Sequence, residues 1–169
     1  MTSHVDIIGL QRPALAQYLD TLGIGAIHTN SVFSALHTPG TRRHLLDRLG
    51  PKKRAQLENS ALLNPVTLIA SQPTISSMSL ESSAEKLLFR TQDGRVIEGV
   101  LLPQSSGRVS FCVSSQAGCG MGCRFCGTAK LGLERNLTTG EIVGQIVIAA
   151  ERCQSKNQRL AAVVFMGMG

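Results

Sequence analysis

The sequence predicts an α/β protein with a helical N-terminal part, a small antiparallel hairpin and one βαβ unit of a parallel sheet. Apolar residues recur at helical spacing up to Leu63. The pair Asp93-Gly94 then separates two apolar runs, which is a strong hairpin signal. From Arg108 the order is strand, loop, helix and strand, and the continuous apolar run at 161–166 is typical of a buried parallel strand.

Residues 1–75 are predicted to form a helical N-terminal domain. Pro39-Gly40 and Gly50-Pro51 are turn and stop signals between its helices. Pro65 and the Ser/Thr-rich stretch at 71–83, interpreted as a loop or weak strand, mark its expected boundary. The helices themselves are expected at residues 11–22, 31–36, 41–49 and 51–63.

The hairpin is predicted over residues 84–104, and the segment that follows, 105–169, opens with a third strand. Thr138 and Glu141 have the spacing of a capping box, so a helix is expected from there to about Cys153. The strands before this helix are expected at residues 86–90, 96–102 and 108–113.

Composition and charge narrow the possible partners. Lys and Arg number 17 against 11 Asp and Glu, and the resulting net charge of +6 suits nucleic acid without requiring it. The absence of Trp and the single Tyr argue against an aromatic base-stacking surface. The sequence shows no signal-peptide pattern and no apolar run long enough for a membrane span, so a cytoplasmic protein without a membrane partner is expected.

Cys119, Cys123 and Cys126 lie in one glycine-rich stretch with the spacing C-x3-C-x2-C. In a reducing compartment, cysteines clustered in this way indicate a metal site rather than disulfides. Closed iron–sulfur and structural zinc sites use four protein ligands, so three thiolates leave one iron of a cubane cluster open to a substrate or cofactor. The surrounding glycines let backbone N–H groups face a negative cluster.

Two other interpretations of these cysteines stay open. Structural zinc is the main alternative, although it prefers paired C-x2-C units with a fourth ligand elsewhere. A thioredoxin-like redox role for Cys123 and Cys126 is the second. The histidines that could complete a zinc site all lie far upstream, at His4, His28, His37 and His44.

The cysteine motif at the end of a strand resembles the radical S-adenosylmethionine (radical SAM) superfamily. Within it, the sequence is similar to the RlmN/Cfr family, whose members methylate an adenosine of 23S ribosomal RNA and, in the RlmN type, certain tRNAs. The similarity is dense from about residue 84 onward and weak before residue 75. It is carried by residues 111–119, 121–126, 135–138, 141–145 and 164–169, the last resembling the start of the family's G-M-G-E-P loop.

The resemblance implies that Cys119, Cys123 and Cys126 hold a [4Fe–4S] cluster whose open iron binds SAM, with flavodoxin or ferredoxin as electron donor. Gly167 and Gly169 would lie against SAM, because a residue without a side chain allows close approach. In the family, one SAM methylates a cysteine in the C-terminal part of the barrel. The radical from a second SAM takes hydrogen from that methyl group, the resulting carbon adds to adenine, and a protein disulfide forms as the product is released.

The resemblance assigns roles to two further residues. Cys112 matches the cysteine of that disulfide, and Glu98 matches the carboxylate proposed to remove the ring proton. Without the resemblance, the residue pattern favours a small buried apolar residue at Cys112, and the alternative for Glu98 is a solvated hairpin residue. The alternation of Val96, Glu98 and Val100 places Glu98 on a face shared with apolar residues, where a carboxylate suits general-base work.

The resemblance also implies that residues 105–169 begin a radical SAM partial (β/α) barrel that is C-terminally truncated, and that residues 1–75 are a candidate RNA-binding part. The Glu-Pro expected after Gly169, the remaining strands and the methyl-carrying cysteine are missing. Three hypotheses follow: a methyltransferase fragment inactive alone, a remnant that binds an iron–sulfur cluster or RNA without methylating, and a zinc-binding RNA-interaction module. Carbon 2 of adenine is favoured over carbon 8 as the target.

Overall fold

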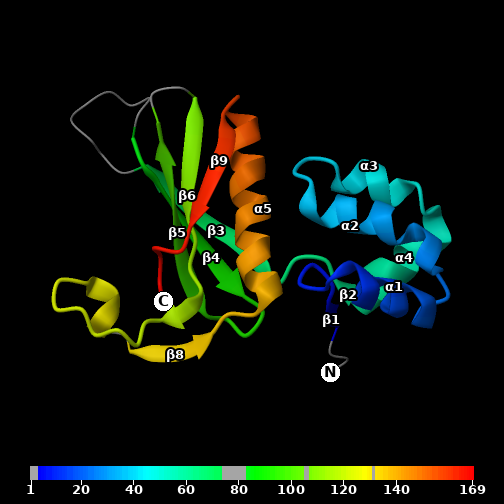
Figure 1. Ribbon diagram of the computed structural model, residues 1–169, viewed down its shortest axis with the longest axis horizontal. Coiled ribbons are helices and arrows are strands. Elements are labelled where there is room, and N and C mark those ends of the chain that lie inside the picture. Colours follow the sequence, from blue (N-terminus) through cyan, green and yellow to red (C-terminus); the bar gives the residue numbers. More distant parts are fainter. Residues whose placement is uncertain (1–3, 74–82, 105–106, 131) are drawn as a thin grey trace.

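A computed structural model describes residues 4–73, 83–104, 107–130 and 132–169. A group of short helices lies on one side and a twisted five-stranded sheet on the other, with the long helix α5 (Thr139–Ser155) between them (Figure 1). The α/β class predicted from the sequence is therefore confirmed.

The helices of the N-terminal part are short because glycine and proline interrupt the apolar pattern. Gly40 and Gly50 both adopt positive φ in the connections, and Pro51 opens the next helix. The buried apolar residues of these helices form one cluster that includes Leu15 and Leu57. Each helix lies where the sequence predicts one, at α1 (Arg12–Thr21), α2 (Thr29–His37), α3 (Arg42–Asp47) and α4 (Pro51–Ser60).

The sheet has the strand order β3-β4-β5-β6-β9. Its first four strands are antiparallel neighbours, whereas β9 pairs with β6 in parallel across the α5 connection. The predicted hairpin and βαβ unit are therefore both present. The strand bounds are β3 (Val66–Pro73), β4 (Glu85–Thr91), β5 (Val96–Pro103), β6 (Arg108–Cys112) and β9 (Arg159–Val164).

Helix α5 packs against both parts of the protein. Val147 joins the apolar cluster of the short helices, whereas Ala149 and Cys153 join the cluster of the sheet. In the sheet cluster, the rings of Phe89 and Phe111 meet edge to face with centroids 6.4 Å apart. Because α5 is covered on two sides, its apolar residues can occupy more of its circumference than the stripe of a surface helix.

The N-terminal strand β1 (Val5–Asp6) contacts the first turn of α5. It pairs in parallel with β2 (Ala61–Leu62). The Thr138 hydroxyl lies 3.3 Å from the Asp6 carboxylate. A Cβ on Gly140 would lie 2.0 Å from the same carboxylate, so a larger residue there would displace the Asp6 side chain. Burial raises the pKa of Asp6, although hydrogen bonds from Thr138 and the backbone oppose this effect.

Three sequence-based expectations are wrong in detail. The helical part ends earlier than predicted, because Val66–Pro73 form strand β3; residues 74–82 of the expected loop lie outside the described residues. The strand predicted at 161–166 is parallel as expected but not buried, since β9 is the edge strand of the described sheet and Met166 just beyond it is 76% exposed. Arg135 and Asn136, in the loop expected before the helix that starts near Thr138, belong instead to strand β8 (Leu133–Asn136).

Within the described ranges, no helix is both long and apolar enough to cross a lipid bilayer.

Candidate functional site

The cysteine loop leaves the carboxyl end of β6 and is closed at its base by a two-stranded ribbon. This ribbon consists of β7 (Gln116–Gly118) and β8 (Leu133–Asn136), paired antiparallel. The Cys119 N–H donates a 2.9 Å hydrogen bond to the Gly132 carbonyl and seals the base. Because Gly118 has a φ of +73° and a Cβ there would lie 2.0 Å from the Gly132 oxygen, no other residue fits this neck.

The backbone of the loop turns tightly around its last two cysteines. The Cys126 N–H donates to the Cys123 carbonyl at 3.1 Å, and a short 3-10 turn at Gly127–Lys130 follows. Hydrogen bonds from the Thr128 and Ala129 backbone lower the pKa of the Cys126 thiol, which favours the thiolate that metals bind. The Met121 N–H also approaches the Cys119 sulfur at 3.5 Å.

The described residues include all three cysteines of the loop, but no group of three His, Cys, Asp or Glu side chains in them is arranged to hold a metal ion. The donor chemistry nevertheless fits a metal cluster, since three thiols share one short loop and backbone N–H groups already bond to two of their sulfurs. The ring of Phe125 beside Cys126 is 94% exposed, so the cysteine loop projects from the protein rather than packing on it.

The two glycines near the end of β9 cross over the carboxyl end of β6. The Met168 carbonyl accepts hydrogen bonds from the Ser115 and Gln116 N–H groups at 2.9 and 3.0 Å. A Cβ on Gly167 would lie 2.6 Å from the Ser114 hydroxyl, and one on Gly169 would lie 2.3 Å from the Ser115 hydroxyl. The close approach that these glycines allow is thus to residues of this chain, and their contact with SAM stays a prediction.

Glu98 and Cys112 share the sheet face that α5 does not cover. Val100 pairs with Cys112 across β5 and β6, and Cys112 pairs with Val164 across β6 and β9, so these side chains point to one side. Glu98, two residues from Val100, points the same way. The register therefore brings Glu98 and Cys112 to one face, next to the strand ends where the cysteine loop begins.

The two residues differ in their surroundings. The Glu98 side chain is 39% exposed and pairs with Lys86 at 3.0 Å, which is the solvated hairpin position left open by the sequence. Cys112 is buried, and burial raises the pKa of its thiol even though the Met166 backbone donates a hydrogen bond to it. None of the five cysteines, all within the described residues, forms a disulfide, so the disulfide implied for Cys112 is not supported.

Gln145 was missed in the sequence and proves central to the strand end. Its side-chain carbonyl accepts from the Ser114 N–H at 3.2 Å, and its amide donates to the Ser114 and Glu141 carbonyls, both at 3.1 Å. Both Gln145 and Ser114 have no exposed surface. The signal was a polar residue on the apolar face of a predicted helix, which requires internal partners.

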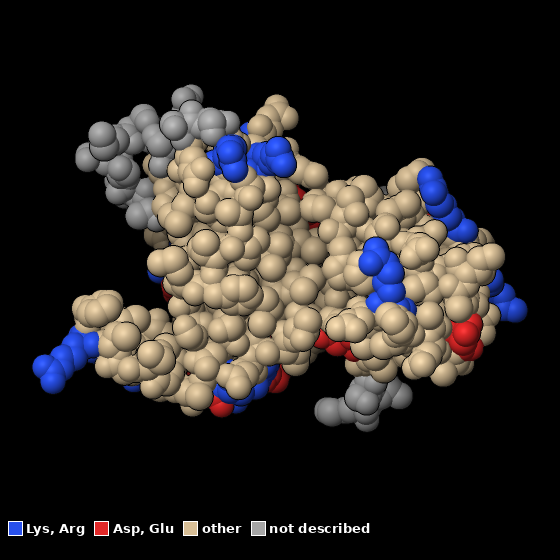
Figure 2. Space-filling view, viewed as in Figure 1, with Lys and Arg blue, Asp and Glu red and all other residues tan. Residues whose placement is uncertain are grey.

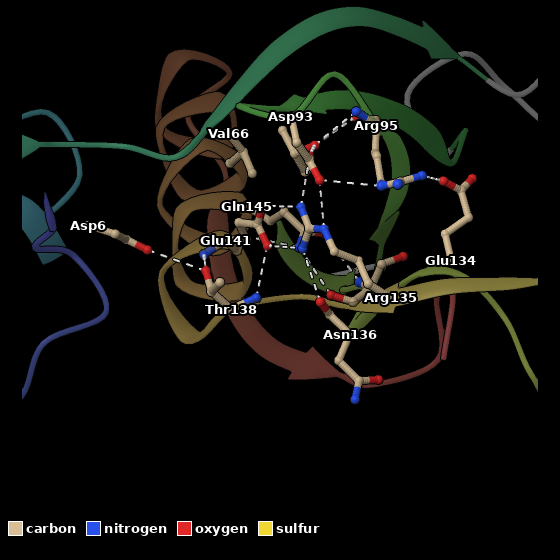
Figure 3. Close-up of polar contacts among 12 residues, drawn as sticks. Asp6, Val66, Asp93, Arg95, Glu134, Arg135, Asn136, Thr138, Glu141 and Gln145 are labelled. Atoms are coloured by element: carbon tan, nitrogen blue, oxygen red, sulfur yellow. Dashed lines mark hydrogen bonds and ion pairs between the residues drawn. The ribbon is translucent and has the colours of Figure 1, made fainter. Parts of the chain in front are cut away.

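Arg135 is the second residue whose role the sequence left vague, and it lies in the middle of a polar network (Figure 3). Its guanidinium donates to both oxygens of Asp93 at 2.8 Å and to both oxygens of Glu141, at 2.7 and 2.8 Å. Glu141 also completes the predicted capping box, accepting from the Thr138 N–H at 2.8 Å. The hydrogen bonds from Arg135 hold the pKa of Asp93 well below its usual range.

Comparisons with known proteins bear on this site. No protein-family model matches the chain. The chain is 38% identical over 172 residues to a Myxococcus xanthus protein named "Dual-specificity RNA methyltransferase RlmN 1", and the match covers 99% of this chain and 45% of that protein. A radical SAM methyltransferase of known structure from Sphaerobacter thermophilus matches with a TM-score of 0.82 and 34% identity, covering 98% of this chain and 47% of that chain.

The chain belongs to the RlmN family of radical SAM RNA methyltransferases. It spans about half the length of the curated relatives it matches. A shorter match, to an Opitutus terrae protein named "Probable dual-specificity RNA methyltransferase RlmN 1", has a higher identity of 52% over 85 residues, which are 50% of this chain and 24% of that protein.

Proposed function

We propose that this chain binds a [4Fe–4S] cluster and SAM as part of an enzyme that methylates an adenosine of 23S ribosomal RNA, with certain tRNAs as further substrates. The main support is the loop of Cys119, Cys123 and Cys126, which is closed at its base by hydrogen bonds and lies at the carboxyl ends of β6 and β9. In barrels of parallel strands this end is where active sites form. The names of the relatives, dual-specificity RNA methyltransferases, support RNA as the substrate class.

The chain's own residues can supply the cluster site. Three thiolates would hold three irons, and glycines around them leave backbone N–H groups free to face the negative cluster. A cluster held by these residues, with one iron left open to SAM, would supply the one-electron reduction that cleaves SAM. Flavodoxin or ferredoxin is the proposed electron donor, and the exposed loop leaves the cysteines within reach of such a protein.

The strand ends would form the floor beside the cluster. The Ser114 hydroxyl donates to the Glu98 carbonyl at 2.6 Å and accepts from the Met168 N–H at 2.8 Å, so it fixes β5, β6 and the glycine run to one another. Gly167 and Gly169 would then present backbone rather than side chains to SAM. Gln145, buried below, holds the Ser114 backbone in place.

On the uncovered sheet face, we assign Glu98 as the base that removes the ring proton, with carbon 2 of adenine as the target. Glu98 is exposed enough to meet a substrate, and its pairing with Lys86 has to open for the carboxylate to accept a proton. Cys112 lies on the same face and would act in product release. We also propose that the helices before β3 contact RNA; on the face in Figure 2, Lys and Arg form separate groups rather than one continuous patch.

Complete methylation is expected to require more than these residues. The relatives are about twice as long as the matched chain. We therefore propose that the chain alone binds the cluster but does not transfer a methyl group. The alternative is a remnant that binds an iron–sulfur cluster or zinc and contacts RNA without serving methylation.

Anaerobic reconstitution with iron and sulfide tests the proposal. The chain should bind about four irons, and Cys123→Ala should lose most of that iron. Cys153→Ala is the matched control, because Cys153 is buried in the sheet cluster away from the loop. A chain that takes up one zinc and no iron would support the zinc alternative and overturn the cluster.

A further inference from the structure

The turn between β4 and β5 contacts two consecutive residues of β8, the strand that returns from the cysteine loop. Asp93 in the turn pairs with Arg135 of β8, and Arg95 after the turn pairs with Glu134 of β8. The charges alternate, acid to base and then base to acid, so a shift of β8 by one residue would place like charges together. Asp93 and Arg135 are 42 residues apart in sequence, so the contacts join distant segments. Together they specify one register of β8 relative to the turn.

The Arg135 guanidinium is held in a fixed orientation. It makes four hydrogen bonds to the carboxylates of Asp93 and Glu141, and a fifth, at 3.0 Å, to the Asn136 carbonyl. Bidentate contacts of this kind fix the plane of the guanidinium as well as its position. Glu141 is buried in the first turn of α5, and Asp93 belongs to a hairpin of the main sheet, so both anchors are parts of rigid elements.

Fixing Arg135 fixes the neck of the cysteine loop. Arg135 pairs with Ala117 in the ribbon, and the next pair is Gly118 with Leu133, across an irregularity in register. Cys119 follows at once, with its N–H bonded to Gly132. The first predicted cluster ligand is therefore two residues from the position that Arg135 holds.

We infer that Arg135, held by Asp93 and Glu141, is a positioning residue. It fixes the conformation of the neck of the cysteine loop, residues 115–119 and 132–137, for cluster binding. The inference rests on the proposed cluster-binding function. It also gives the β4–β5 turn a role in the site although the turn carries no ligand. The contacts of Arg135 with the two carboxylates are polar and are not part of the apolar core of the sheet. Their loss should therefore loosen the neck while the sheet stays folded.

The chain offers a matched control at the other end of α5. Arg152 donates to a single oxygen of the buried Glu85 at 2.7 and 3.1 Å, which joins helix and sheet without touching the loop. Arg135→Gln and Arg152→Gln thus remove the same charge from two ion pairs to buried glutamates. Asp93→Asn weakens the contacts of Arg135 from the side of the turn. Arg135→Lys keeps the positive charge but cannot form the bidentate hydrogen bonds of a guanidinium.

Hydrogen–deuterium exchange of the metal-free chain provides a readout that needs no cluster. In Arg135→Gln, amides at the neck, residues 115–119 and 132–137, should exchange about tenfold faster than in the wild type, while the β4 and β5 amides stay protected. Arg152→Gln should leave the neck unchanged. Equal neck protection in Arg135→Gln and Arg152→Gln would overturn the inference.

The reconstituted chain provides the second readout. Arg135→Gln should lose iron to a chelator about tenfold faster than the wild type and show a broadened electron paramagnetic resonance signal when reduced, with Arg135→Lys between the two. Asp93→Asn and Arg135→Gln combined should cost little more than Arg135→Gln alone. An iron-loss rate and a resonance signal like those of the wild type in Arg135→Gln would contradict the inference. A wild-type chain that binds no iron would contradict the proposed function, and the hydrogen-exchange result would then test the positioning role of Arg135 by itself.

Discussion

The two ends of α5 use the same ion-pair chemistry for different purposes. At the N-terminal end, Arg135 pairs with Glu141, whose side chain is 6% exposed, and at the C-terminal end Arg152 pairs with Glu85, which is 8% exposed. The first pair extends outward to Asp93 and ties the loop ribbon to the hairpin turn. The second is completed by Lys156 at 2.6 Å and joins only helix and sheet.

This difference shows that burial of a charge pair does not reveal its role. Both glutamates are buried and both are satisfied, so both pairs resist disruption in the folded state. What separates them is the element they hold: a strand that returns from the cysteine loop, or a helix already fixed by apolar packing. The loop end should therefore respond in cluster binding, and the sheet end in stability.

The largest expected effect is at the neck of the loop. Gly118→Ala forces a side chain into positive φ and against the Gly132 carbonyl, so iron binding should fall at least about tenfold. Gly120→Ala is the control, because its Cβ would lie 3.6 Å from Leu133, an ordinary contact. Iron content after anaerobic reconstitution measures the effect. Similar iron content in the two variants would show that the neck does not control the loop.

The next effect lies between the two ends, at Gln145. Gln145→Ala leaves the N–H and carbonyl of Ser114 without these partners in a fully buried position, which should lower the free energy of unfolding by about 2 kcal/mol. Urea denaturation of the metal-free chain measures it, with Gln17→Ala on the exposed side of α1 as control. A loss within about 0.5 kcal/mol of the control would remove Gln145 from the account.

A smaller effect should appear with pH. Arg135 lowers the pKa of Asp93, so the folded state binds fewer protons than the unfolded state as pH falls through the unfolded pKa. The stability from this pair is complete above about pH 4 and is lost at lower pH. Asp93→Asn should therefore lose less stability than the wild type between about pH 5 and pH 2, measured by urea midpoints. Parallel curves for the two proteins would show that the pair adds no stability.

The smallest effect concerns the uncovered sheet face. Lys86→Ala removes the exposed partner of Glu98, and such pairs contribute about 0.5 kcal/mol. Stability and iron content should both stay near those of the wild type. A large loss of iron would show that this sheet face also takes part in cluster binding. It would contradict the claim that cluster binding depends on the contacts at the N-terminal end of α5.

The sequence predicted the regular elements well, because local signals specify them. Asp93-Gly94 located the hairpin, and the capping box of Thr138 and Glu141 located the start of α5. Strand β8 was missed because it lacks an apolar run of its own and exists through its pairing with β7. Strand β3 was assigned to the helical part although Val66, Leu68 and Ile69 are apolar, and its pairing with β4 shows that it belongs to the sheet. Residues 161–166 were predicted to be buried because the run is apolar, yet burial depends on what covers a strand rather than on the strand.

The candidate site divides in the same way. The three cysteines are predicted as ligands from their spacing alone, because candidate ligands on one loop are visible in sequence. Arg135 and Gln145 act through partners on distant elements, and only the fold shows that Asp93 lies beside Arg135. The roles predicted for Glu98 and Cys112 come from the resemblance, and the strand register adds that both residues belong to one face of the sheet.

The most direct test of the central claim is the Mössbauer spectrum of the chain reconstituted with isotopically enriched iron, recorded with and without SAM. Three protein thiolates should leave roughly one iron in four without a cysteine ligand, and the signal of that iron should shift when SAM is added. A spectrum of a [4Fe–4S] cluster with one SAM-responsive iron is the predicted result. The absence of a cluster, or a cluster whose irons all ignore SAM, would contradict the account.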